Sequence, residues 1–488
     1  MAPAPRLSGE RPYLAPRPHP YPHPGPERSA IATRDLTVGP VRGHLAALAG
    51  PMMLGIVAAM SVALVDAFFV GQLGTTELAA ISFTFPVVFA VQSLSIGLGA
   101  GTASVVSRAI GEGDRDQVKR LSTDSLVLAV LLVAGVALVG WLTVEPLFRL
   151  LGARAETLPI IVEYMRIWYI GMPFLVIPMV ANNIIRANGD ATVPSAIMIA
   201  ASVINAGLDP LLIFGLWGLP ELGVAGAAWA SVIARAVTLL ISLAVVVFRE
   251  RLVDLAVPPM AAMWASWRRI LSIGVPAALG NAINPVAITV VTAIVASYST
   301  AAVAGFGVAT RIEAFAAIPM LALSAAIGPI AGQNWGRGER ARVLSALRQS
   351  YAFCAVYGVA AAALLFVFGD AITALFTQDE SAAPISSAYL AIVPVSFAGY
   401  GITTIAAGCY NALGKPLTGL AYYATRSVLL YVPLAWVASL FLPTWGVFAG
   451  IAASNVVGGA IVAWHSLQWL GQAEQGDCRP AGAMQPAE

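Results

Sequence analysis

Long apolar stretches, separated by short polar segments, dominate the chain from residue 44 to residue 470. They lack the polar stripe that a surface helix of a soluble protein carries. Many run for roughly 18 to 30 residues, enough to cross about 30 Å of hydrocarbon at about 1.5 Å per residue. The pattern therefore predicts an all-α integral membrane protein with twelve transmembrane helices. The expected spans are 44–72, 80–109, 122–145, 157–186, 193–217, 223–248, 267–297, 302–333, 345–368, 383–411, 417–441 and 445–470.

The twelve expected spans form two sets of six that match when the sequence is shifted by 225 positions, the separation of Pro51 and Pro276. The same shift aligns Tyr164 with Tyr389 and the polar loop 111–114 with the loop 336–339. Several landmarks at one offset indicate an internal repeat. Because each copy has an even number of spans, the two copies are parallel, an arrangement that lets two bundles rock around a central site.

The repeat divides the chain into an N-lobe, a linking loop, a C-lobe and two tails. Residues 1–43 are rich in proline and are expected to form a disordered cytoplasmic tail, because such a segment builds neither a helix nor a core. The polar residues 471–488 are expected to be disordered as well. The predicted lobes are 44–248 and 267–470, joined by a cytoplasmic loop at 249–266.

Composition strengthens the prediction of a membrane protein, and charge predicts its orientation in the membrane. Only 11% of residues are charged, against about a quarter in soluble domains. Of the 27 basic residues, only Arg149 and Arg154 fall in loops on the side away from the N-terminus. Since basic loops stay in the cytoplasm, both termini are expected there, in a multi-pass protein of the inner (plasma) membrane.

Two aspartates interrupt the apolar spans of the first half. A carboxylate at the centre of a membrane helix costs roughly 2.5–3.5 kcal/mol, so each marks a candidate functional site. Asp66 and Asp209 lie at similar depth, about 10 Å below the outer surface by helix rise. Asn205 is one turn from Asp209 on the same face, and Ser231 reaches the same level from the next span. Burial and a neighbouring carboxylate both favour the protonated acid, so this layer can hold a proton. The alternative is that each aspartate merely bonds a helix end or a buried serine.

The acid layer is not repeated in the second half, where Val291 and Leu434 stand at the matching positions. A coupling site needs to exist once, whereas a structural role could occur in both copies. This asymmetry favours the functional interpretation of Asp66 and Asp209.

Other polar residues inside the spans are candidates for a substrate cavity. Span 302–333 carries Arg311 and Glu313, which do not share a helix face; either one faces a cavity or both bond neighbouring helices. Three amides in the spans suit broad recognition of organic compounds: Gln92, Asn281 and Asn284. Arg235 and Arg426 receive no role from the sequence.

Four segments resemble the multidrug and toxic compound extrusion (MATE) transporters, across about residues 40–470. They are DAFFVGQLGTTELAA (66–80), NAGLD (205–209), GVAGAAWAS (223–231) and PIAGQNWG (329–336). The resemblance implies two six-helix lobes around a central cleft and cation-coupled export of organic compounds by alternating access.

Within that family, the resemblance to the DinF-like branch implies a proton site in the N-lobe. Its aspartate of the first span corresponds to Asp66, and its Asn/Asp pair of the fifth span to Asn205 and Asp209. The resemblance also implies that a hydroxyl of the sixth span corresponds to Ser231. It implies a bend of the first helix at Pro51, where a backbone donor is missing.

The sodium-coupled NorM branch of the family has acids in its seventh and tenth spans. This sequence has none in 272–297 or 383–411, which favours protons over sodium as the coupling ion. We expect no cofactor and no bound metal.

The sequence thus predicts a proton-coupled antiporter that exports cationic or amphipathic compounds, works as a monomer in the bilayer and binds no nucleic acid. Two alternatives of the same superfamily stay open. One is a lipid-linked oligosaccharide flippase, although holding a pyrophosphate usually takes several cations; the other is a dedicated natural-product exporter. An enzyme is not expected, because the spans contain no HisGluXXHis motif and no Ser/His/Asp set.

Overall fold

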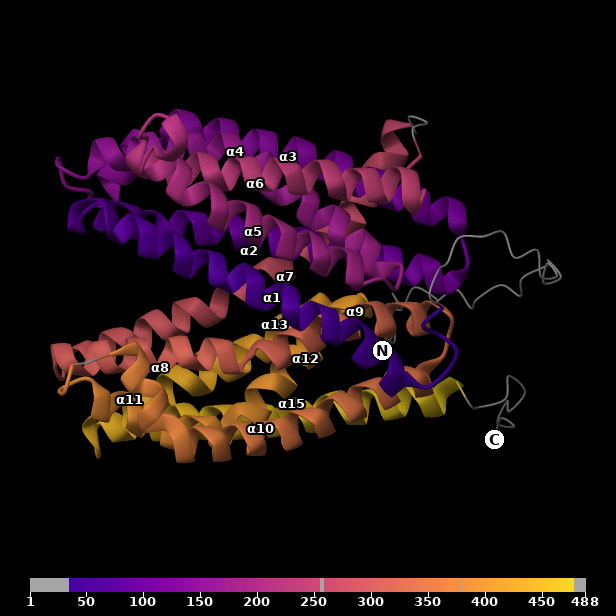
Figure 1. The fold of residues 1–488 in the computed structure, drawn as a ribbon. Coiled ribbons are helices and arrows are strands. Elements are labelled where there is room, and N and C mark those ends of the chain that lie inside the picture. Colours follow the sequence, from indigo (N-terminus) through magenta and orange to yellow (C-terminus); the bar gives the residue numbers. More distant parts are fainter. Residues whose placement is uncertain (1–34, 255–258, 378, 478–488) are drawn as a thin grey trace, which may run out of the picture. The chain divides into compact units, whose positions relative to one another are not determined.

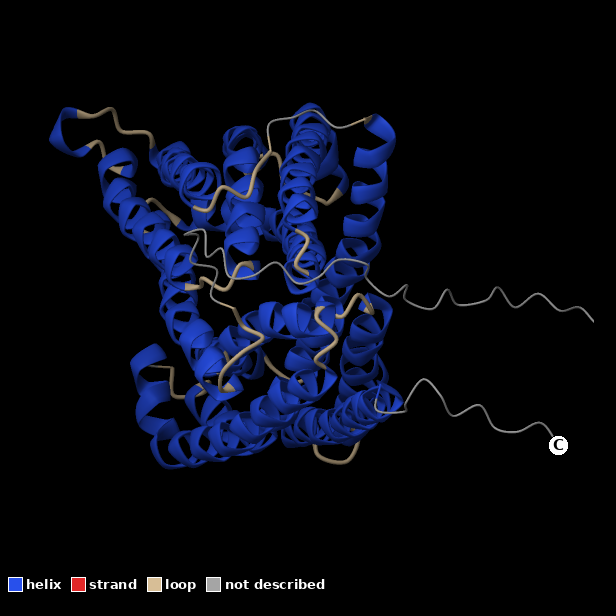
Figure 2. Ribbon diagram, turned by 90° about the vertical axis from the view of Figure 1, so that its right-hand side faces the viewer, coloured by secondary structure: helices blue, strands red, loops and turns tan. Residues whose placement is uncertain are grey.

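The structure is a computed structural model that describes residues 35–254, 259–377 and 379–477. Within these residues the chain forms helices joined by loops and turns, and no strand occurs (Figures 1 and 2). These described residues form one compact unit. The prediction of an all-α protein is confirmed.

The first half of the chain forms one helix for each of the six expected spans, with short helical turns beside two of them. The elements are α1 Val41–Gly71, α2 Thr75–Glu112, α3 Arg115–Leu150, α4 Leu158–Ala187, α5 Thr192–Ile213, the 3-10 turn η1 Leu216–Gly218, α6 Gly223–Ala244 and the π-helical turn η2 Val245–Arg249.

The second half is more broken. Its elements are α7 Met260–Ala296, α8 Thr300–Ala316, α9 Ile318–Gly336, α10 Arg340–Phe376, α11 Ala383–Ile392, the 3-10 turn η3 Val393–Ser396, α12 Phe397–Ala412, α13 Pro416–Ala424, the π-helical turn η4 Thr425–Tyr431, α14 Val432–Ser439 and α15 Pro443–Asp477.

Ten of the described helical stretches are long and apolar enough to cross a membrane, and the pair α8 and α9, bent by 43°, makes an eleventh. Pro319, in the first turn of α9, cannot continue a helix from α8, because its nitrogen carries no hydrogen. The twelfth expected span, 417–441, falls on α13, η4 and α14, which follow one another directly. The fold is therefore that of a membrane protein with the expected helix order.

The helices form two lobes, with α1 and α7 running between them (Figure 1). The start of each of these helices packs into the core of the other lobe. Leu45 and Leu48 of α1 belong to the apolar core of the second half, and Ile270 and Ile273 of α7 belong to the core of the first half. Each half is thus held to the other by its first helix.

A close approach of two backbones joins α2 to α7. A Cβ atom at Gly97 would lie 2.3 Å from the carbonyl oxygen of Gly274, so only glycine fits at position 97. The two lobes therefore meet here without intervening side chains.

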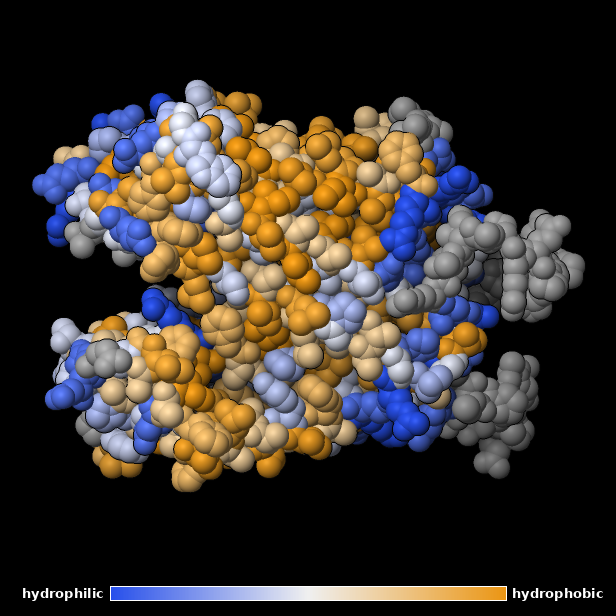
Figure 3. Space-filling view, in the orientation of Figure 1, coloured by the Kyte–Doolittle hydropathy of each residue, from blue (hydrophilic) through white to orange (hydrophobic). Residues whose placement is uncertain are grey.

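The surface has a broad apolar zone between two hydrophilic ends (Figure 3). Leu142 of α3 is 63% exposed and Phe366 of α10 is 71% exposed. An apolar surface of this extent is not expected in water, and it matches the hydrocarbon layer of a bilayer. Figure 3 also shows a hollow between the lobes on the side away from the start of α1.

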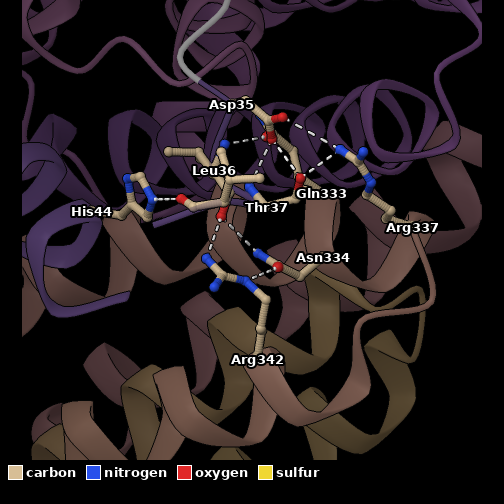
Figure 4. Close-up of polar contacts among 9 residues, drawn as sticks. Asp35, Leu36, Thr37, His44, Gln333, Asn334, Arg337 and Arg342 are labelled. Carbon is tan, nitrogen blue, oxygen red and sulfur yellow. Dashed lines mark hydrogen bonds and ion pairs between the residues drawn. The ribbon is translucent and has the colours of Figure 1, made fainter. Parts of the chain in front are cut away.

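The prediction of a disordered tail through residue 43 is wrong for residues 35–43, while residues 1–34 lie outside the described residues. Leu36 is buried, and its N–H donates to Oε1 of Gln333 at 3.2 Å (Figure 4). Its carbonyl accepts from Asn334 Nδ2 at 3.1 Å and from Arg342 Nη2 at 3.2 Å. One buried leucine and a bonded backbone therefore order the segment directly before α1.

The same segment touches both lobes. Gln333 of α9, which accepts from Leu36, donates through Nε2 to the carbonyl of Ala187 at the end of α4 (2.7 Å). Beside it, Arg337 donates to Asp35 Oδ2 at 3.3 Å and to Thr37 Oγ1 at 2.6 Å. The residues before α1 thus help to close the side of the molecule on which α1 begins.

Several other expected helix boundaries shift, among them the start of α7 and the end of α15. Helix α7 begins at Met260 and not at 267, and α15 continues to Asp477 and not only to 470. In both places polar or basic residues near the membrane surface suggest a shorter helix, although helices often extend beyond the hydrocarbon layer. Residues 255–258 of the expected loop and 478–488 of the expected C-terminal tail lie outside the described residues.

Candidate functional site

Asn205 links the polar residues that the sequence places in one layer. In the amide orientation that satisfies its neighbours, its nitrogen donates to Oδ1 of Asp66 at 3.1 Å. Its oxygen then accepts from the hydroxyl and from the backbone N–H of Ser231, each at 3.3 Å. Asn205 is only 3% exposed, so these bonds are made away from bulk solvent.

Local packing explains why these groups meet. Asn205 and Asp209 are four residues apart, and therefore lie on one face of α5. Helix α5 packs against both α1 and α6. The approach to α6 is close at Gly226, where a Cβ atom would lie 2.4 Å from the carbonyl oxygen of Leu212. The glycine lets α6 bring Ser231 up to Asn205.

The side chains of Asp209 and Asp66 lie close enough to one another to interact directly. Asp209 is fully buried, and neither of its carboxylate oxygens receives a hydrogen bond from another described residue. Two carboxylates can form a hydrogen bond only when one of them carries a proton. The arrangement is therefore suited to holding a proton between the two acids.

Two further residues that the sequence does not assign to the site lie near this pair. Tyr164 of α4 and Arg235 of α6 are close enough to Asp66 to interact with it electrostatically. Nη1 of Arg235 is buried and has no hydrogen-bond partner among the described residues. An arginine inside a span is itself a signal of function. The sequence does not identify the partner of Arg235, because Asp66 lies on another helix.

A cavity of about 610 Å³ lies between the lobes and reaches this layer. Asn205, Ser231 and Arg235 form part of its wall, together with apolar residues of α1, α2, α4, α5 and α9. Arg186 also lines it, although the sequence places this residue at the cytoplasmic end of a span. None of the described lining residues is an aspartate or glutamate.

The five cavity residues expected from the sequence divide into two groups. Gln92 and Asn281 line the cavity. Asn284, Arg311 and Glu313 are not among the lining residues, and for these three the expectation is corrected. Arg311 is exposed on α8, whereas Asn284 and Glu313 belong to a separate polar cluster.

That cluster lies within the second lobe. Tyr389 of α11 donates a hydrogen bond to Glu313 of α8. Arg426 of η4 interacts electrostatically with Glu313 and donates to Asn284 Oδ1 at 2.5 Å and to Asn455 Oδ1 at 3.2 Å. The sequence alternative in which residues of this span bond neighbouring helices therefore holds for Glu313.

The two lobes thus treat their buried acids differently. Val291, which matches Asp66 in the repeat, is fully buried and apolar. In the second lobe Glu313 accepts a hydrogen bond from a tyrosine and lies near an arginine. In the first lobe no described residue donates a hydrogen bond to Asp209, and its carboxyl lies near that of Asp66.

Pro51 lies inside α1, which is continuous from Val41 to Gly71. The next residue, Met52, lines the cavity. A proline in a helix removes one backbone hydrogen bond and weakens the helix there. Any bend of α1 at this point would change the cavity wall.

Among the described residues, no group of three or more His, Cys, Asp or Glu side chains is placed to hold a metal ion. The acids that do meet, Asp66 and Asp209, are a pair.

Comparison with known proteins agrees with this architecture. A family model described as MatE matches the chain twice, at residues 51–211 and 276–437. The chain is 37% identical to the FAD transporter of Shewanella oneidensis, over 87% of this chain and 94% of that protein.

Solved structures are similar as well. The MATE transporter VcmN of Vibrio cholerae in the bent form superposes with a TM-score of 0.83 at 31% identity, covering 89% of this chain and 97% of that one. A multidrug resistance MATE transporter in the outward-facing conformation gives a TM-score of 0.87 at 25% identity, covering 92% and 100%. The two family matches fall on the two halves of the repeat, and so the chain belongs to the MATE family of secondary transporters and is not an enzyme.

Proposed function

We propose that this protein is a proton-coupled antiporter that exports amphipathic organic compounds, with Asp66 and Asp209 as the proton-binding groups. The proximity of these two carboxyls carries the proposal, because a hydrogen bond between them requires that one of them carry a proton. Asn205 and Ser231 act as positioning residues, since Asn205 bonds both Asp66 and Ser231. The first lobe alone supplies the site, as the DinF-like resemblance implies.

Protonation is coupled to a change of shape in this proposal. In the outward-open state, protons from outside reach the two acids and neutralise them. The neutral acids exchange hydrogen-bond partners, α1 bends near Pro51, and the cargo is released. The membrane potential adds about 2.3 kcal/mol per charge per 100 mV to the driving force.

We assign the side on which α1 begins to the cytoplasm of the inner membrane. The basic loops support this orientation, because cytoplasmic loops carry most arginines and lysines. The hollow between the lobes then faces outward (Figure 3). The described lining residues come from both lobes of one chain, which supports a monomer as the working unit.

The cavity supports the amphipathic part of the cargo prediction better than the cationic part. Its walls are largely apolar, but its charged residues are Arg186 and Arg235, with no acid among the described lining residues. The Shewanella relative is named a FAD transporter, so flavin dinucleotide is a candidate cargo for this chain too. Sodium coupling and lipid-linked oligosaccharide transport receive no specific support from the site.

The test uses purified protein in proteoliposomes with a pH gradient imposed across the membrane. Asp66→Asn and Asp209→Asn should each abolish gradient-driven transport of a flavin or of ethidium while leaving the protein folded. Glu145→Gln is the matched control, because Glu145 forms an exposed ion pair with Arg149 (2.5 Å) far from the cavity. Wild-type transport by either aspartate variant, or transport driven by sodium alone, would contradict the proposal.

A further inference from the structure

Arg186 brings a positive charge to the cavity without a carboxylate partner. It belongs to the last turn of α4 and lines the cavity. Its guanidinium donates to Asn183 Oδ1 at 2.6 Å and contacts the sulfur of Met52 at 3.9 Å, and both of these groups are neutral. None of the ion pairs between described residues includes Arg186.

Such an arrangement is unfavourable for a residue that only supports the fold. A charge removed from water gains stability when a counter-ion accompanies it, and a lone one is destabilising. Charged residues in membrane helices that face an internal cavity generally belong to a substrate or ion path. Arg186 faces such a cavity and keeps several N–H donors that no described residue accepts.

The other arginine of the cavity differs in this respect. Arg235 lies in the electrostatic field of Asp66, whose carboxylate offsets its charge when ionised. Arg186 has no acid nearby among the described lining residues. The cavity is therefore most positive at the end formed by the last turn of α4, which is the cytoplasmic end in the proposed orientation.

We propose that Arg186 binds the anionic group of the cargo, and that the cargo is an amphipathic organic anion bearing a phosphate. This assignment rests on the proposed function, because it gives the chemistry of the same cavity. The planar guanidinium presents paired N–H donors that match two phosphate oxygens, and the apolar walls accommodate the uncharged body of the molecule. An inside-negative membrane potential drives an anion outward and so favours its export.

Riboflavin and riboflavin 5′-phosphate form a matched pair of probes, since they share one ring system and differ in the phosphate. Binding to the full-length protein in detergent is followed by quenching of flavin fluorescence. The wild type should bind the phosphate ester at least tenfold more tightly than riboflavin. Arg186→Gln should remove this preference and leave riboflavin binding unchanged, and Arg186→Lys should retain part of it.

Arg166→Gln is the control variant. Arg166 is also on α4, but it lies against the ring of Trp141 and does not line the cavity. It should keep the wild-type preference for the phosphate ester. Thermal unfolding of Arg186→Gln should show no loss of stability, because the variant removes a charge that lacks a counter-ion.

Equal binding of the two flavins by the wild type, or an equal loss of both in Arg186→Gln, would overturn the anion site. The binding measurement needs no proton gradient, so its result is independent of the coupling mechanism. Proton-driven transport of riboflavin 5′-phosphate that depends on Asp66 but not on Arg186 would leave the proposed function standing and refute the anion site. Phosphate-dependent binding without any proton-driven transport would support the anion site and refute the proposed proton-coupled export.

Discussion

Tyr164 and Tyr389, which match in the internal repeat, each lie near a buried acid in their own lobe. Tyr389 donates its hydroxyl hydrogen to Glu313, while Tyr164 lies within electrostatic range of Asp66 and Asp209. The two lobes therefore share a tyrosine but differ in how the charge of the acid is compensated. This difference separates a coupling site from a structural one.

We expect the acid of the second lobe to matter for stability and not for coupling. Tyr389→Phe leaves the Glu313 carboxyl without its donor in a buried place, which should cost about 1–3 kcal/mol of unfolding free energy. Thermal unfolding in detergent measures the loss, and Tyr298→Phe is the control, because Tyr298 makes only a long bond of 3.4 Å to Ser439. Unchanged stability together with lost proton coupling in Tyr389→Phe would contradict the assignment.

Close contact between the lobes should depend on Gly97. Gly97→Ala places a Cβ atom against the Gly274 backbone, and such overpacking should destabilise the protein by about 1–3 kcal/mol. Gly135→Ala, on the exposed side of α3 with open space around it, should instead be neutral or stabilising by up to about 1 kcal/mol. Thermal unfolding compares the two, and equal effects would show that the α2–α7 approach does not need glycine.

Bending of α1 should depend on Pro51. Pro51→Ala restores a backbone donor and strengthens the helix by an amount of the order of 3 kcal/mol, which should slow transport while cargo still binds. Transport rate and flavin binding are measured on the same preparation. Pro86→Ala, inside α2, serves as the control and should leave the rate unchanged. A full transport rate in Pro51→Ala would remove the bend from the mechanism.

The ordering of the segment before α1 should depend on pH only under acidic conditions. Partial burial alone would raise the pKa of Asp35, but hydrogen bonds from Thr37 and the charge of Arg337 together lower it below its usual value. The stabilisation from this carboxylate is therefore complete above its unfolded pKa of about 3.9 and is lost as the pH falls through the lower folded value.

A fluorescent label on Val38→Cys, an exposed position, reports the mobility of this segment through its anisotropy. Mobility should stay constant from about pH 8 to pH 5 and rise only below about pH 4. Asp35→Asn should raise it between about pH 8 and pH 5, where the wild-type carboxylate is ionised, and Arg337→Gln should act in the same direction. A rise in wild-type mobility between about pH 8 and pH 5 would show that a group other than Asp35 holds the segment.

The order of the helices and the layer of candidate site residues could be predicted from the sequence. Span length follows from bilayer thickness, and the cost of a buried charge singles out Asp66 and Asp209 without any knowledge of packing. Depth along a helix also follows from residue number, because each residue adds about 1.5 Å. Asn205 and Ser231 were expected at that depth for the same reason, and the structure brings them together.

Only the tertiary structure decided which way each polar side chain faces. Rotation of a membrane helix about its axis is set by its neighbours, since every face of an apolar helix is equally compatible with lipid. Arg311 was therefore expected at a cavity and is exposed, while Arg186, the last residue of the expected span 157–186, lines the cavity. The order of residues 35–43 likewise depends on Gln333 and Arg342, nearly 300 residues away in the sequence. The sequence determined the helices and the depth of their charges, and packing between the lobes determined which of those charges meet.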